Sequence, residues 1–147
     1  MELTQNPSVL ELVRKTAELT TPKEIVWIDG SEAQLESLRK IAVETGELIK
    51  LNEEKLPGCY LNRSDVNDVA RVEGRTFICS RTREEAGPTN NWMDPDEMKA
   101  KLHEILRGAM AGRTMYVIPY AMGVIGSPFA KYGLSLIHIS EPTRHAQ

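Results

Sequence analysis

Apolar residues recur at helical spacing in three segments of the chain, and each segment has its own start and stop signals. The first predicted helix starts at Pro7, which suits the first helical position, and Asn6 suits the capping position before it. Pro22 closes the segment because a proline cannot continue a helix. The apolar stripe consists of Val9, Leu10, Val13 and Ala17.

A second helix is predicted after Ser31. Gln34 lies three residues later, which is the spacing of a capping box, and Gly46 is placed to end the helix. One face of this helix is apolar and consists of Leu35, Leu38, Ile41 and Ala42.

A third helix has the same kind of start. Asp94 is the predicted cap, Pro95 takes the first helical position and Glu97 completes the box, while Gly112 lies beyond the end. Its apolar stripe consists of Met98, Leu102, Ile105, Leu106 and Ala109.

Short β-prone runs separate these helices. They cover residues 25–28, 48–51, 60–61, 76–79 and 115–118. Helices interleaved with apolar strands predict an α/β layer structure. The last run extends almost without interruption to Met122, which is typical of a strand covered on both faces. Any part of such a strand that stays uncovered exposes an apolar patch, so we expect the isolated chain to be marginally stable and prone to aggregate.

Two stretches fit neither period. Residues 80–94 are predicted to form a long loop, and loops of this length are often functional. Within it, Asn90, Asn91 and Trp92 either line a pocket or simply order the loop. Residues 127–133 resemble the lead-in to a further element that the chain does not reach.

Composition places the chain among ordinary folded proteins. Hydrophobic residues make up 41% and charged residues 27%, a balance unlike that of disordered chains. The net charge of −3 gives no basic footprint for nucleic acid. Neither a signal peptide nor a membrane-spanning run is evident, so we expect no membrane association and a cytoplasmic protein. Cys59 and Cys79 lie in apolar runs and are predicted to be buried thiols, with a disulfide or metal pair as the alternative.

Catalytic motifs are sparse. No GxxxxGK[ST] phosphate loop occurs, and the nearest glycine-rich stretch, residues 123–128, lacks the lysine and is predicted to be a turn. His103 lies off the apolar stripe of the third helix and is expected at the surface, while His138 and His145 fall near the end of the chain. We therefore predict no catalytic residue and no metal site on these 147 residues.

Arg71 is the strongest candidate for a binding residue. It lies in a polar cluster, between Asp68 and Glu73, just ahead of the run at 76–79. A guanidinium there can bind a carboxylate or a phosphate through paired donors. The alternative is a surface ion pair with Asp68 or Glu73, which contributes little.

Several segments resemble, in order, the GTP-dependent phosphoenolpyruvate carboxykinases. The matching segments are DVARVE at 68–73, RTFICS at 75–80, AGPTNNWM at 86–93, GRTMYVIPYAMG at 112–123 and GSP at 126–128. The long run at 112–123 is the most specific of them. The resemblance covers about residues 7–134 and implies an α/β domain with a mixed sheet flanked by helices, incomplete here.

The family converts oxaloacetate and GTP to phosphoenolpyruvate, GDP and CO2, a step of gluconeogenesis that uses a divalent metal, Mn or Mg. The resemblance implies that the phosphate loop, the metal ligands and a mobile lid lie outside this chain, which is then inactive alone and binds no cofactor. It implies one substrate-binding residue here, Arg71, which would position the carboxylate or phosphate of the substrate. A monomeric parent enzyme is also implied.

Two domain assignments follow. Residues 1–134 are predicted to be a truncated N-terminal domain of the family, and residues 135–147 a foreign or disordered tail. The string SLIHISEPTRHAQ resembles translated sequencing-adapter read-through, and a divergent natural terminus is the alternative. Two other functions stay open: a non-catalytic anion-binding module that uses Arg71, or a product with no function of its own.

Overall fold

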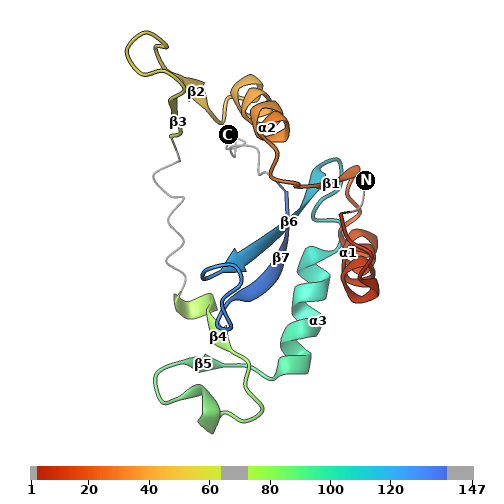
Figure 1. The fold of residues 1–147 in the computed structure, drawn as a ribbon. Helices are drawn as coiled ribbons and strands as arrows, with labels where there is room; N and C mark the ends of the chain where they lie inside the picture. Colours follow the sequence, from red (N-terminus) through yellow and green to blue (C-terminus); the bar gives the residue numbers. More distant parts are fainter. Residues whose placement is uncertain (1–2, 64–72, 139–147) are drawn as a thin grey trace.

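The computed structural model describes residues 3–63 and 73–138 of the chain (Figure 1). Three α-helices, seven strands and two short 3-10 helices alternate in this part. In order they are α1 (Pro7–Thr20), β1 (Glu24–Trp27), α2 (Glu32–Glu44), β2 (Ile49–Lys50), β3 (Tyr60–Leu61), η1 (Glu73–Arg75), β4 (Phe77–Ile78), η2 (Glu84–Ala86), β5 (Asn91–Trp92), α3 (Pro95–Leu106), β6 (Thr114–Met122) and β7 (Lys131–Ile137). The predicted α/β class is confirmed.

The helix starts agree with the capping signals, but the two capping boxes are only half formed. Ser31 accepts from the backbone N–H of Gln34, and Asp94 accepts from that of Glu97. The Glu97 side chain instead accepts from Lys101 at 2.8 Å. The Gln34 amide accepts from the backbone N–H of Asp29 at 2.8 Å and donates to the Trp27 carbonyl at 2.7 Å. This amide therefore ties the end of β1 to the start of α2.

The largest sheet of the described chain has the strand order β1-β6-β7. β1 runs parallel to β6, with Glu24 opposite Thr114, and β7 runs antiparallel to β6, with Val117 opposite Leu136. Parallel and antiparallel neighbours in one sheet confirm the predicted mixed sheet. Two further pairs, β2–β3 and β4–β5, are separate small sheets.

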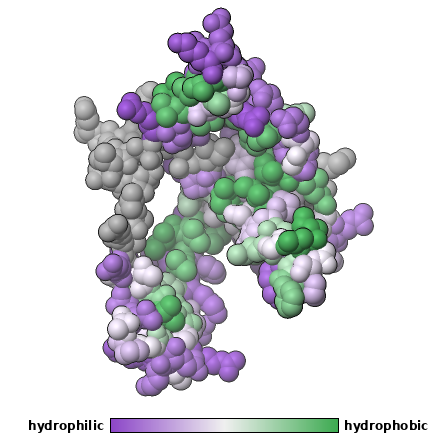
Figure 2. All heavy atoms as spheres, turned by 60° about the vertical axis from the view of Figure 1, so that its left-hand side comes forward, coloured by the Kyte–Doolittle hydropathy of each residue, from purple (hydrophilic) through white to green (hydrophobic). Residues whose placement is uncertain are grey.

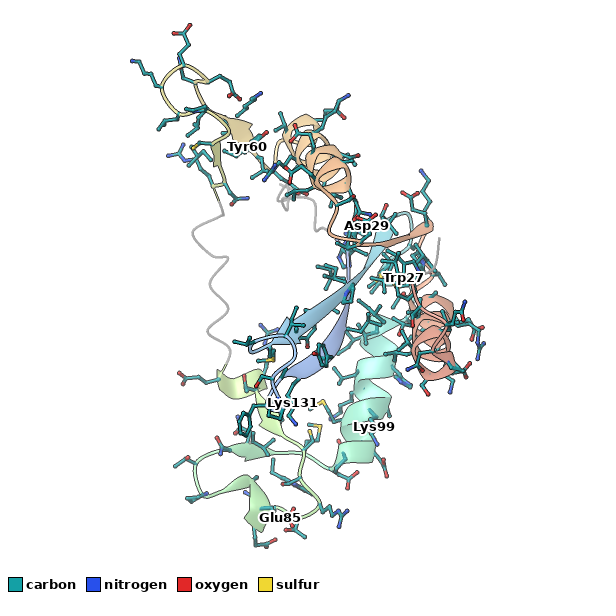
Figure 3. All side chains as sticks on the ribbon, in the orientation of Figure 1. Trp27, Asp29, Tyr60, Glu85, Lys99 and Lys131 are labelled. Carbon is teal, nitrogen blue, oxygen red and sulfur yellow. The ribbon has the colours of Figure 1, made fainter. Side chains whose placement is uncertain are left out.

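The core lies where α1 covers one end of this sheet. Its buried members are Val13, Met110, Met115 and Val117, and Ala17, Trp27, Leu134 and Leu136 pack against them. Backbone hydrogen bonds hold the same end together: the N–H groups of Gly108 and Met110 donate to the carbonyls of Leu19 and Thr20. The turn after α3 is thus fixed to the end of α1. Figure 3 shows Trp27 beside α1, close to this junction.

Elsewhere the chain is open. Its accessible surface is 12042 Å2, whereas a compact monomer of 16.5 kDa exposes roughly 7,500 Å2. Hydrophobic residues reach the surface over several parts of the face seen in Figure 2. α3 has the predicted apolar stripe but no buried residue, because the described chain covers it only in part: Leu102 is 45%, Ile105 72% and Leu106 41% exposed.

Two predictions about the sheet need correction. Residues 127–133 do lead into an element that the chain contains, since β7 begins at Lys131. The strand also includes residues 135–137 of the predicted foreign or disordered tail, and each of them pairs with a residue of β6. The origin of residues 135–147 stays a prediction, and residues 139–147 lie outside the described part.

Candidate functional site

The predicted substrate-binding residue, Arg71, lies outside the described residues, as do Asp68 and the rest of the segment 64–72. The structure therefore describes neither its side chain nor its predicted pairing with Asp68 or Glu73. The described chain resumes immediately after this segment, at Glu73 in η1.

Asn91 fixes the backbone at that point. Its side-chain amide donates to the carbonyl of Glu73 at 2.9 Å and to that of Thr76 at 3.2 Å. Asn91 itself belongs to β5, which pairs in parallel with β4, and Phe77 lies opposite it. The backbone of Glu73, two residues after Arg71, is thus held by a residue eighteen positions later in the sequence. Sequence reasoning missed this contact because it joins β5 to the backbone in and after η1 across a loop.

The loop at 80–94 orders itself through side-chain donors. The Trp92 indole N–H donates to the Ser80 carbonyl at 3.1 Å, and the Asn90 amide donates to the Ala86 carbonyl at 2.7 Å. Ala86 is 5% exposed and is the buried centre of the loop. Asn90, Asn91 and Trp92 all bond to backbone carbonyls, which supports the ordered-loop alternative rather than a pocket. The loop also contains β5, which was not predicted.

A small pocket of about 170 Å3 lies at the start of β6, lined by Ile41, Thr45, Glu47, Gly112, Arg113, Thr114 and Tyr116. Burial raises the pKa of the Tyr116 hydroxyl. Two polar residues of the pocket form hydrogen bonds with residues that do not line it. Thr114 donates to Glu24 at 2.6 Å, and Arg113 contacts His138 at 2.7 Å. Arginine only donates, so His138 accepts in this contact. These pairs hold the strand ends together, and no chemistry is assigned to the pocket.

A larger, more open pocket of about 580 Å3 lies between α2 and the β2–β3 pair. Its charged residues have both signs, including Lys40, Glu44 and Lys50. Lys50 is paired with Glu53 at 2.7 Å, which raises the pKa of the lysine and lowers that of the carboxyl. Mixed charges that pair with neighbours do not select an anion or a cation.

No group of three or more His, Cys, Asp or Glu side chains able to hold a metal occurs within residues 3–63 and 73–138. The described residues therefore do not fit the divalent metal that the resemblance implies. The prediction of buried thiols was wrong, because Cys59 and Cys79 are both exposed. They lie in or beside two-stranded sheets that have little to pack against. His103 is exposed, as predicted.

The glycine-rich stretch is a turn, as predicted. It joins β6 to β7, and Gly123 and Gly126 have φ values of 92° and 89°, which side chains rarely adopt. Ser127 accepts from the backbone N–H of Phe129 at 3.2 Å within the same turn. Among the described helices, none is both long and apolar enough to cross a bilayer.

Comparison with known proteins gives a consistent result. The family model described as "Phosphoenolpyruvate carboxykinase N-terminal domain" matches residues 11–140. Among the relatives found are three that carry the name phosphoenolpyruvate carboxykinase [GTP]. The protein from Corynebacterium kroppenstedtii is 54% identical over 133 residues, which are 90% of this chain and 21% of the relative. Those from Neocallimastix frontalis and Anaeromyxobacter dehalogenans are each 51% identical, over 89% and 90% of this chain and 22% of each relative.

The chain thus spans about a fifth of the length of the curated relatives it matches. The family model covers most of the chain, from α1 to beyond β7, and includes every described strand. The chain therefore belongs to the phosphoenolpyruvate carboxykinase N-terminal domain family.

Proposed function

We propose that these residues are part of a GTP-dependent phosphoenolpyruvate carboxykinase. The proposed reaction converts oxaloacetate and GTP to phosphoenolpyruvate, GDP and CO2, in the cytoplasm and in the service of gluconeogenesis. The observation that carries the proposal is the 54% identity over 90% of the chain to a relative of that name. We further propose that the whole enzyme is monomeric.

GTP and a divalent metal, Mn or Mg, belong to the proposed reaction but not to this chain. The metal would stabilise the enolate that decarboxylation leaves and the phosphoryl group that it accepts. Because the described residues offer no metal-ligand group, no step is assigned to them through the metal. The part proposed for this chain is to hold the substrate.

Arg71 is the residue proposed for that role. The substrate has a carboxylate at every stage, and the product adds a phosphate. A guanidinium is always charged and presents paired donors in one plane, so it can hold either group without exchanging a proton. Asn91 supports the proposal from the described side, because it fixes the backbone at Glu73.

A chimera tests this role. The chain replaces the matching 133 residues of the C. kroppenstedtii relative, and kcat/KM is measured for oxaloacetate and for phosphoenolpyruvate. Arg71→Ala should lower kcat/KM roughly 10- to 150-fold, the equivalent of a lost charge-assisted contact of ~1.5–3 kcal/mol. Arg71→Lys should restore little of the lost kcat/KM, because lysine keeps the charge but lacks the paired planar donors of the guanidinium.

Arg75→Ala is the matched control. Arg75 is exposed at the end of η1 and forms no ion pair with any described residue, so its removal should leave kcat/KM unchanged. Arg71 would be only a surface ion-pair residue if both of its variants kept kcat/KM within about twofold, less than one lost hydrogen bond. A chimera without carboxykinase activity, combined with binding of phosphoenolpyruvate by the 147-residue chain, would favour an anion-binding module instead.

A further inference from the structure

Large hydrophobic side chains are concentrated at one end of the β6–β7 hairpin. We call residues 119–132, which form the far ends of both strands and their turn, the distal hairpin. Its exposed members are Tyr120, Met122, Val124, Ile125, Phe129 and Tyr132, with exposed fractions between 47% and 86%. Single exposed hydrophobic residues are normal, but six within one hairpin are a patch of the kind that marks an interface.

The patch has two apolar faces. Directly opposed residues of an antiparallel pair share a face and successive residues alternate, so Ala121 and Tyr132 lie on one face and Tyr120 on the other. A strand that is apolar on both faces is normally covered on both. In the described chain α1 covers only the other end of the sheet, where Met115 and Val117 are fully buried.

Charge and hydrogen bonding point the same way. Lys131 is the one charged residue in the distal hairpin, and Figure 3 shows it at the hairpin end of β7. β7 is an edge strand of seven residues, and its outer edge has no strand partner among the described residues. Edge strands that face water are normally short or protected by charges. This edge and these faces are suited to an apolar partner that contributes backbone hydrogen bonds.

We propose that the distal hairpin is the docking surface for the part of the full-length carboxykinase that lies outside these 147 residues. This inference rests on the proposed function, since it requires the longer protein. The relatives are several times longer than the chain, so a large partner surface is available within one polypeptide. The exposed fractions of the distal hairpin, which reach 86% at Phe129, are what a segment separated from its neighbours shows.

Two methionines of β6 provide a matched pair of probes. Met115 is 0% exposed and Met122 is 65% exposed, and both are in the same strand. Hydrogen peroxide oxidises accessible methionines to sulfoxides, which mass spectrometry counts residue by residue. In the chimera with the C. kroppenstedtii relative, the oxidation rate of Met122 should be as low as that of Met115. In the 147-residue chain, Met122 should react much faster than Met115.

The chimera alone decides the question, even where the isolated chain does not fold. Rapid oxidation of Met122 beside a protected Met115 in the chimera would overturn the inference. Protection of Met122 in the chimera that appears only at high protein concentration would also overturn it, because the occupant would then be a second copy. The two proposals fail separately. A chimera without carboxykinase activity but with a protected Met122 refutes the proposed function and supports the docking surface. An active chimera with an exposed Met122 supports the function and refutes the docking surface.

Discussion

The two ends of β6 have nearly the same kind of sequence and opposite environments. Met115 and Val117 at the first end are fully buried, whereas Met122 at the other end is 65% exposed. The difference comes from the neighbours: α1, β1 and the turn after α3 meet at the first end only. The apolar sequence of a strand thus indicates that it should be buried, but the position of the other elements determines which part of it is buried.

Truncating the methionine at each end should separate the two environments most strongly. Met115→Ala should lower the free energy of unfolding of the 147-residue chain by about 2–5 kcal/mol, because it leaves a cavity in a core with few members. Met122→Ala is the control and should change it by less than about 0.5 kcal/mol. Urea denaturation followed by circular dichroism measures both, and equal losses would refute the comparison. In the chimera, the docking inference predicts that Met122→Ala becomes costly too.

Cutting the chain within β7 tests whether residues 135–137 belong to the buried end. Truncation after Leu134 removes Leu136, which packs on the core, and three pairings with β6. Relative to truncation after His138, we expect a loss of roughly 1.5 kcal/mol, the lower end of the range for burying a leucine because Leu136 is only partly buried, seen as a lower Tm. Equal Tm values for the two truncated chains would show that residues 135–137 do not stabilise the fold and belong to the predicted tail.

A cross-strand contact lies near the exposed end, where Tyr120 is opposite Gly133. A β-carbon at position 133 would lie less than 3.0 Å from three atoms of Tyr120, so the tyrosine ring occupies the space above Gly133. Gly133→Ala should therefore destabilise the chain by about 1 kcal/mol, the lower range for an overpacked site, because Tyr120 is half exposed and can move. In a Tyr120→Ala background the same substitution should cost nothing measurable in urea denaturation. A cost that persists there would place its cause in the backbone.

The smallest effect should come from the exposed junction between β1 and α2. The backbone and side-chain groups of Ser31 donate to Asp29, which holds the pKa of that carboxyl below its ordinary value of 3.8. A lowered folded-state pKa stabilises the fold above the unfolded pKa and is lost as the pH falls through the folded one. Between about pH 4 and pH 2, the wild type should therefore lose slightly more stability than Asp29→Asn. Identical pH profiles in thermal melts would show that the contact contributes nothing.

Local signals in the sequence were sufficient wherever a short stretch decides its own structure. Asn6, Ser31 and Asp94 start the three helices as predicted, because a cap needs only N–H groups two or three residues away. The turn at residues 123–128 follows in the same way from its glycines. Family membership was also predictable, since the run at 112–123 is long and specific.

Contacts between distant segments could not be predicted from the sequence. Apolar neighbours suggested buried thiols at Cys59 and Cys79, yet both are exposed, because the strands next to them lie in two-stranded sheets without a covering layer. The two residues of β5 gain their strand conformation from β4, and Gln34 leaves its capping box to hold β1.

The same distinction applies to Arg71: its chemistry was predicted from the sequence, but the residue lies outside the described part of the structure. The sequence by itself determined the helices, the apolar strands and the family. Tertiary structure decided which apolar surface is buried, because burial depends on the facing element and no local pattern contains that element.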